Sequence, residues 1–371
     1  MSSTEEFAFD YALLAELTEA RGVPGYEDRI REIVRRELEP VADEIRGDAM
    51  GNVVATRHGD ADFEVAISAH MDEIGFMIRH VTEEGFAQLD ALGGWDPRVL
   101  RAQRVTIHTD AGNVPGVLGS VPPHTMDDEE REKTPKVGDV HVDLGLDGER
   151  ARERVQPGDL VTMDQETKVV GDHVTGKALD DRACLFTMIE AARRLDGNES
   201  EEGGVTDGAS EHDGSQPTIH FAASVQEEVG LRGAEALGVD LEPDVAIALD
   251  VTVANDVPGF SAGEHVTDLG EGVAIKLKDS SVITSPKVTD RLRQVAEERA
   301  IPHQLEVLPA GGTDTAGFQT GAGATPVGAL SVPTRYLHTV TESAHHEDIA
   351  ATIDLLTAAL ETETGEFDYS L

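Results

Sequence analysis

The residues best suited to chemistry in this 371-residue chain are two adjacent glutamates, Glu227 and Glu228. They follow an apolar run at 219–225, which has the length and composition of a buried strand. Two carboxylates at the end of a buried strand are costly unless a metal ion or a shared proton compensates their charge. Because adjacent residues of an extended chain point in opposite directions, we expect the two glutamates to differ in role.

Four further apolar runs lead to residues of the types that bind metals. These residues are His70 and Asp72 after residues 65–69, Asp180 and Asp181 after residues 176–179, Asp250 after residues 245–249, and His338 after residues 326–337. Taken singly, each has a structural interpretation, since an aspartate often caps a helix or forms a turn and a lone histidine is often structural. The i, i+2 spacing of His70 and Asp72 would let the carboxylate accept the second N–H of the imidazole.

Taken together, these residues predict a metal centre. Ligands of α/β proteins bind beyond the carboxyl ends of the strands, so these groups should meet at one edge of a sheet. Imidazole and carboxylate donors suit Zn²⁺, Co²⁺ or Mn²⁺. His70, His338, Asp180, Asp250 and Glu228 exceed the needs of one catalytic ion and suit two ions about 3.5–4 Å apart that share a carboxylate. The spare Glu227 would then be the general base for a bridging water, and the chemistry would be hydrolysis of an amide.

The elements that must position these groups alternate between helices and strands. Amphipathic helices are predicted at 8–21, 26–38, 181–195 and 347–360, with another opened by Ser285-Pro286, and strands are predicted at 65–69, 218–226, 245–249 and 327–332. This rhythm predicts an α/β fold with a mostly parallel sheet and helices on both faces.

Residues 76–172 interrupt this rhythm. Their periodicity is close to two and their turns are frequent, which predicts an inserted β-rich, barrel-like domain. We therefore expect one catalytic domain formed by 1–75 and 173–371. The acidic, Gly-rich segment 196–216 has no apolar pattern and is expected to be a mobile loop.

The chain is strongly acidic, with 72 Asp and Glu against 30 Lys and Arg and a net charge of −42. We expect a surface adapted to high salt, as in a halophile, with stability that falls at low salt. The same charge argues against nucleic acid and against anionic membranes as partners. The first residues do not resemble a signal peptide and no apolar stretch approaches about 20 residues, so we expect a cytoplasmic protein. Cys184 fits a small core residue.

Seven segments, in order along the chain, resemble the M42 family of metallopeptidases, which includes glutamyl aminopeptidases and the tetrahedral TET aminopeptidases. The segments are residues 68–75, 93–97, 119–124, 176–182, 226–230, 311–314 and 333–338. The resemblance implies His70 and Asp250 on one ion, Glu228 and His338 on the other, Asp180 as the bridging carboxylate, Glu227 as the general base and Asp72 as the support of His70.

The resemblance also implies an activity and an assembly. The activity would be removal of N-terminal residues from peptides by a metal-bridged hydroxide, with Glu227 as general acid and base. The insert 76–172 would be a dimerisation domain, and dimers would form a twelve-subunit particle with active sites facing an internal cavity. The loop 311–314 would lie near the substrate pocket.

Three alternatives compete with this prediction. A dimetal deacylase or carboxypeptidase on the same scaffold would need a positioned arginine, and Arg182, Arg232 and Arg335 are available. A glycosidase would need two carboxylates astride a sugar bond and no metal. A non-enzymatic assembly or peptide-binding protein with a decayed site would lack a ligand or the base, and none is missing.

Two further histidines, His345 and His346, could be mistaken for metal ligands. We interpret them as exposed residues at the start of the last helix.

Overall fold

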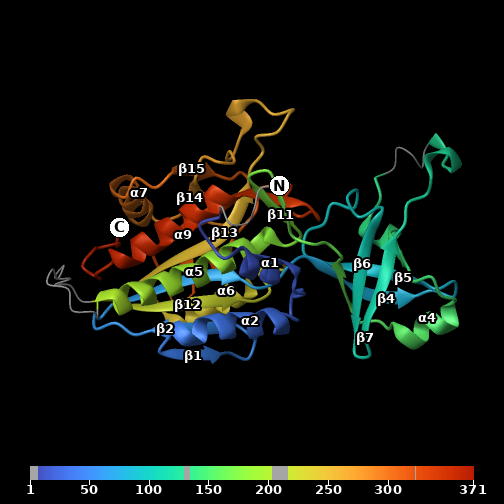
Figure 1. The fold of residues 1–371 in the computed structure, drawn as a ribbon, viewed down its shortest axis with the longest axis horizontal. Helices are drawn as coiled ribbons and strands as arrows, with labels where there is room; N and C mark the ends of the chain where they lie inside the picture. Colours follow the sequence, from blue (N-terminus) through green and yellow to red (C-terminus); the bar gives the residue numbers. More distant parts are fainter. Residues whose placement is uncertain (1–6, 129–133, 203–215, 322) are drawn as a thin grey trace.

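The computed structural model describes residues 7–128, 134–202, 216–321 and 323–371. Within them, a large sheet covered by helices lies beside a smaller barrel (Figure 1). Short 3₁₀ helices occur at η2 (Glu39–Val41), η3 (Pro123–Thr125), η4 (Val137–Asp139) and η5 (Ala262–Glu264).

The large sheet has 11 strands, and the four at its centre run parallel. In order across the sheet these are β12 (Thr218–Ser224), β3 (Glu64–His70), β13 (Val245–Val253) and β16 (Val327–Arg335). Helices cover both faces of these strands, so nearly all their residues are buried. That burial is why they appear in the sequence as continuous apolar runs.

The outer strands make the sheet mixed. Antiparallel pairs extend it with β1 (Glu44–Gly47) and β2 (Val53–Arg57) on one side and with β17 (Glu342–His345), β11 (His173–Gly176) and β10 (Lys168–Val170) on the other. The parallel pair β14 (Val273–Lys278) and β15 (His303–Val307) joins β16 in the antiparallel sense. The predicted α/β class is confirmed, with the parallel order confined to the centre and to this pair.

Helices pack on the two faces of the sheet around separate cores. One face carries α1 (Tyr11–Glu19), α2 (Asp28–Leu38), α5 (Leu179–Glu202), α7 (Pro286–Glu298) and α9 (His346–Glu361), and the other carries α6 (Arg232–Leu241) and α8 (Asp314–Gln319). Ser285 precedes α7 with Pro286 in its first turn, as predicted. The helix α5 continues past Leu195 to Glu202, so the acidic segment begins as helix, and residues 203–215 lie outside the described residues.

The β-rich insert is a closed barrel of six strands, shown at the right of Figure 1. Their order is β4 (Gly75–Val81), β5 (Phe86–Leu92), β8 (His141–Asp143), β7 (Gly112–Leu118), β6 (Gln103–Thr109) and β9 (Leu160–Met163), and α4 (Gly148–Arg154) packs against β4. Alternate residues such as Phe76 and Ile78 point inward to form its core. The predicted barrel-like insert is therefore confirmed.

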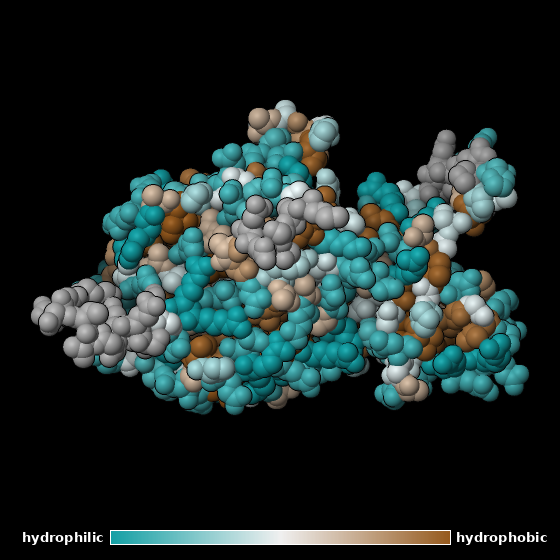
Figure 2. All heavy atoms as spheres, in the orientation of Figure 1, coloured by the Kyte–Doolittle hydropathy of each residue, from teal (hydrophilic) through white to brown (hydrophobic). Residues whose placement is uncertain are grey.

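The face of the molecule drawn in Figure 2 is mainly hydrophilic. Figure 2 shows hydrophilic residues over most of the visible face, with apolar residues in small separate patches. In the described parts of the chain, no helix combines the length and the apolarity needed to cross a bilayer.

Candidate metal centre and active site

The predicted ligands meet where the four central parallel strands end. His70 is the last residue of β3, Glu228 follows β12 by four residues, and His338 follows β16 by three residues. Asp180 lies at the start of α5, which passes beneath these strand ends. Asp250 was expected to end its strand but lies inside β13, which continues to Val253 because residues 251–253 still pair with β16.

Asp180 stands between the two histidines. Its Oδ1 lies 3.2 Å from Nε2 of His70, and its Oδ2 lies 3.3 Å from Nε2 of His338. Among the described residues, donor atoms within 4.8 Å of one another form two groups. The first group is His70, Asp180, Asp181 and Asp250. The second group is Asp180, Glu228 and His338. Asp180 belongs to both groups, which is the arrangement expected of a carboxylate shared by two ions.

Two buried oxygens of these groups support the same interpretation. Oδ1 of Asp181 and Oε1 of Glu228 have no hydrogen-bond partner among the described residues. A buried carboxylate oxygen without a donor costs about 1–3 kcal/mol or more. Because all donors in the two groups are imidazole nitrogens or carboxylate oxygens, the residues fit divalent ions such as Zn²⁺, Co²⁺ or Mn²⁺.

Charge at the site is poorly balanced by protein groups alone. Burial by itself would lower the pKa of both histidines. The hydrogen bond to Asp180 and the nearby carboxylate of Asp72 outweigh it at His70 and raise that pKa well above its usual value. At His338, the hydrogen bond and charge of Asp180 and the charge of Glu228 outweigh burial and raise the pKa to about 10. Burial opposes ionisation of Asp180, yet the hydrogen bonds from His338 and His70 hold its pKa below the usual range.

The other carboxyls of the site behave in the opposite way. Burial first, and then repulsion from neighbouring carboxylates, raises the pKa values of Asp181, Glu227, Glu228 and Asp250 well above the usual range. A cation placed among them would remove the repulsion and favour their ionised forms. The site thus contains more buried carboxyl groups than basic groups, and a divalent ion would stabilise their ionised forms.

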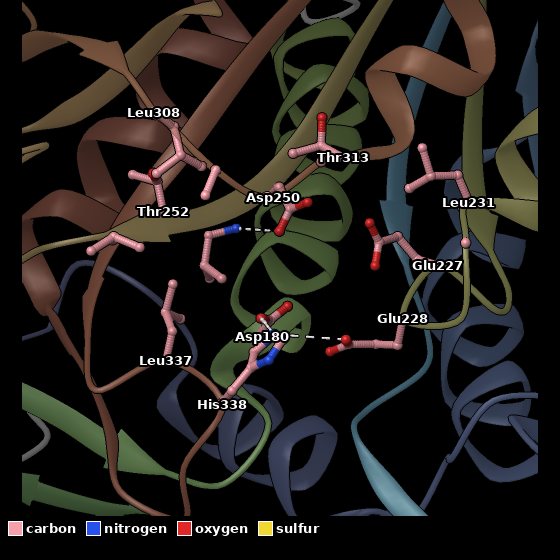
Figure 3. Close-up of a pocket in the computed structure, with 16 residues that line it drawn as sticks. Asp180, Glu227, Glu228, Leu231, Asp250, Thr252, Leu308, Thr313, Leu337 and His338 are labelled. Atoms are coloured by element: carbon pink, nitrogen blue, oxygen red, sulfur yellow. Dashed lines mark hydrogen bonds and ion pairs between the residues drawn. The ribbon is translucent and has the colours of Figure 1, made fainter. Parts of the chain in front are cut away.

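Glu227 and Glu228 occupy different positions, as their adjacency suggested. Glu228 belongs to a ligand group, whereas Glu227 belongs to neither. Oε2 of Glu227 lies 3.9 Å from Nε2 of His70, and Figure 3 shows this carboxylate facing the pocket beside Asp250. A carboxylate beside the ligands rather than among them can exchange a proton.

The carboxylate of Asp72 holds the chain that carries both glutamates. Its Oδ1 accepts the backbone N–H of Glu227 at 3.0 Å, and its Oδ2 accepts that of Glu228 at 3.1 Å. The second imidazole nitrogen of His70 lies 3.1 Å from the backbone oxygen of Asp72 and 3.6 Å from its carboxylate. The backbone oxygen of Asp72, not its carboxylate, thus makes the closer contact with His70. The carboxylate is turned toward the segment after β12, where it accepts the N–H groups of Glu227 and Glu228.

Glu342 is a second carboxylate of this kind, and the sequence did not single it out. It is 1% exposed in β17, where its Oε2 accepts the backbone N–H of Asp180 at 3.0 Å and its Oε1 accepts that of His338 at 2.9 Å. Burial and the charge of Asp180 raise its pKa to about 8. The only signal in the sequence is its position four residues after His338, in a polar stretch without an apolar run.

The barrel also contributes to the site. The carbonyl of Gly94, which follows β5, accepts a hydrogen bond of 2.7 Å from Nδ1 of His338. This contact fixes the tautomer and leaves Nε2 free to face Asp180 and Glu228. A Cβ on Gly94 would stand 3.0 Å from Nδ1 of His338, so a glycine allows this close approach.

The donor groups open into a pocket of about 590 Å³ (Figure 3). Asp180, Glu227, Glu228, Asp250 and His338 form one part of its lining. Gly311, Gly312 and Thr313 line another part, while Asp314 is buried behind them and accepts hydrogen bonds from Ser68 and Ser224. The segment 311–314 thus lies beside the pocket, where the resemblance placed it.

The three arginines that a carboxypeptidase could use lie outside this pocket. Arg182 is completely buried and donates to the backbone oxygen of Leu17 at 2.7 Å. Arg335 makes two hydrogen bonds of 2.6 Å to Asp256, and Arg232 is exposed. None of them lines the pocket. The geometry therefore does not favour recognition of a substrate carboxylate.

The remaining predicted residues lie elsewhere. His345 and His346 are half-buried rather than exposed, because their rings stack on each other at a centroid distance of 5.1 Å and Phe7 stacks on His346 at 4.8 Å. His345 caps α9 by accepting the N–H of Glu347. Cys184 is completely buried in α5, as expected of a core residue.

Comparison with known proteins places this geometry in a family. The sequence pattern of the M42 glutamyl aminopeptidases matches residues 51–355. A lysyl aminopeptidase from Pyrococcus furiosus is 35% identical over 363 residues, which cover 95% of this chain and 97% of that protein.

Solved structures agree with the sequence comparison. An aminopeptidase from the archaeon Desulfurococcus kamchatkensis has a TM-score of 0.87 at 34% identity, over 96% of this chain and 95% of that one. The TET1 peptidase of Pyrococcus horikoshii, which can assemble into a tetrahedron or a large octahedral shell, has a TM-score of 0.80 at 32% identity, over 94% of this chain and 98% of that one. With its buried imidazole and carboxylate cluster, this chain is a metallo-aminopeptidase and belongs to the M42 peptidase family.

Proposed function

We propose that the enzyme removes N-terminal residues from peptides with two divalent ions that share Asp180. His70 and Asp250 hold one ion, with Asp181 close enough to contribute, and Glu228 and His338 hold the other. The observation that carries this proposal is the position of the Asp180 carboxylate, with one oxygen 3.2 Å from His70 and the other 3.3 Å from His338. The donor set favours Zn²⁺ or Co²⁺, with Mn²⁺ as a further candidate.

The protein groups around the ions then have separate tasks. When bound, the ions supply Lewis acidity to the scissile carbonyl and lower the pKa of water. Glu227 takes the proton of the attacking water and returns it to the leaving amine, because it lies at the pocket wall outside both ligand groups. Asp72 and Glu342 keep the backbones of three ligands and of Glu227 in place through four N–H contacts.

A chelator experiment tests this function. Hydrolysis of aminoacyl-p-nitroanilides is measured at high salt with and without chelator, and then after addition of Zn²⁺, Co²⁺ or Mn²⁺. We expect chelation to abolish activity and one or more of the ions to restore it. Activity indifferent to chelation would reject the two-metal mechanism.

We further propose that the protein forms dimers through the insert 76–172 and that dimers assemble into a twelve-subunit particle. The likeness to the shell-forming TET1 peptidase supports this, as do two exposed valines of the insert, Val117 in β7 and Val121 after it, which are 49% and 57% exposed. Light scattering behind size-exclusion chromatography in molar KCl measures the mass. A monomeric mass would contradict the proposal.

We also propose a cytoplasmic location. The chain has one cysteine, Cys184, and therefore no internal disulfide, which is compatible with a reducing compartment.

A further inference from the structure

The pocket has two chemically different parts. All its ionisable side chains belong to the metal centre, and the rest of the lining carries no charge. The uncharged side chains are Leu231, Val251, Thr252, Val253, Leu308, Ala310, Thr313 and Leu337. Figure 3 shows Leu308, Thr252 and Leu337 along one side of the acidic group and Leu231 on the other. A substrate side chain leaving the metal centre therefore meets mostly apolar walls.

The two hydroxyls in this wall are already engaged. Oγ1 of Thr252 donates to Oε1 of Glu306 at 2.7 Å, which turns the hydroxyl away from the pocket. Oγ1 of Thr313 lies 2.7 Å from Oγ1 of Thr315. A polar or charged substrate side chain would find few partners on these walls.

Charged residues do lie behind Thr252, but the wall seals them off. Glu306 and Lys276 are each 0% exposed, and they form an ion pair with each other. Lys276 cannot reach an acidic substrate, and Glu306 cannot reach a basic one, unless the wall opens. A charged substrate side chain would thus lose its hydration without gaining a counter-ion, which is unfavourable.

We propose that this enzyme prefers peptides whose N-terminal residue is uncharged and apolar, of the size of leucine or methionine. This preference rests on the proposed aminopeptidase function. It would distinguish the chain from the lysyl aminopeptidase of Pyrococcus furiosus and from the glutamyl activity in the family's description, both of which concern charged residues. The free α-amino group of the substrate would meet the carboxylates of the metal centre.

The first test compares leucyl, lysyl and glutamyl aminocoumarins with the metal-loaded enzyme in about 1 M KCl, where the Debye length of about 3 Å screens the net charge of −42. We expect kcat/KM for the leucyl substrate to exceed both others by about 100-fold. A lysyl or glutamyl substrate hydrolysed as well as the leucyl one would overturn the preference but leave the aminopeptidase function intact. Hydrolysis of none of the three would overturn that function and the preference with it.

The second test places a charge on the wall. Leu308→Glu should raise the ratio of lysyl to leucyl kcat/KM by about 10-fold or more. Leu308→Lys should raise the ratio of glutamyl to leucyl kcat/KM by a similar factor. The matched control is Leu305→Glu, because Leu305 is 43% exposed in β15, which ends one residue before Leu308, and does not line the pocket. Equal shifts at both positions, or none at Leu308, would show that this wall does not select the substrate. Should a Leu308 variant fail to fold, the wild-type ratios alone decide the proposal.

Discussion

Replacing Glu342 by glutamine should weaken metal binding without touching a metal ligand. In the wild type, the two oxygens of Glu342 accept the backbone N–H groups of Asp180 and His338 at 3.0 and 2.9 Å. Glutamine has one oxygen and one NH₂ group, so one of these buried N–H groups would face another donor. Losing a hydrogen bond to a charged acceptor costs about 1.5–3 kcal/mol. If that cost falls wholly on the metal-bound state, the Kd rises about 10- to 100-fold.

The assay is a chelator-buffered titration with Zn²⁺, run on the wild type, on Glu342→Gln and on the exposed control Glu347→Gln. It is best run at pH 9, above the pKa of about 8 of Glu342, since the ionised carboxylate accepts both N–H groups. The deficit of the variant should shrink as the pH falls through 8, because the protonated wild-type side chain then resembles the amide. A Kd within threefold of the wild type at pH 9 would refute the idea that Glu342 positions Asp180 and His338.

Three further predictions concern the base, the protons and the surface charge. Glu227→Gln should lower kcat by about 10²–10⁴-fold while elemental analysis still finds two ions per chain, and a kcat near the wild type would contradict its role as base. Metal binding at pH 7 should release protons, because the pKa of His338 is about 10 in the metal-free protein and the ion needs the neutral ring. Affinity should therefore rise with pH up to about 10, and calorimetry in two buffers of different ionisation enthalpy would detect the released protons; no release would contradict this. The thermal midpoint should be higher in molar KCl than in dilute buffer, since salt screens the net charge of −42, and the reverse order would refute adaptation to salt.

The barrel and the catalytic sheet depend on each other at His338. The Gly94 carbonyl of the barrel segment orients this histidine, and Val340, two residues later, is packed into the core of the barrel. Whatever assembly the barrel supports, it also fixes the tautomer of a proposed ligand. A change in how the barrel sits against the sheet would therefore alter the metal centre directly.

Much of the site could be predicted because buried parallel strands are conspicuous in a sequence. Strands β3, β12 and β13 are continuous apolar runs, so a His, Asp or Glu in or just after such a run stands out. The rule that ligands gather at the carboxyl ends of parallel strands then brings His70, Glu228 and Asp250 together without coordinates.

The turns that aim the ligands could not be predicted. Five residues near the ligands have left-handed backbone conformations with φ between 56° and 63°, which are Ala178, Gln226, Leu231, Tyr336 and His338. None is a glycine, so the sequence carries no signal for them, and each conformation costs about 1–3 kcal/mol. Carboxylates support two of them, since Glu27 accepts the N–H of Gln226 at 3.3 Å and Glu342 accepts the N–H of His338 at 2.9 Å.

The sequence by itself determined the fold class, the inserted barrel and the types of residue that meet at the sheet edge, because burial and strand periodicity are local properties of the chain. Only the tertiary structure decided how those residues are supported and what the pocket admits. Four features depend on contacts between segments far apart in the sequence. They are the place of Asp181 in the first ligand group, the contact of Glu342 with Asp180, the contact of Gly94 with His338, and the buried ion pair of Lys276 and Glu306. Such contacts leave no periodic pattern in the chain, because they are set by where strands and barrel come to rest against one another.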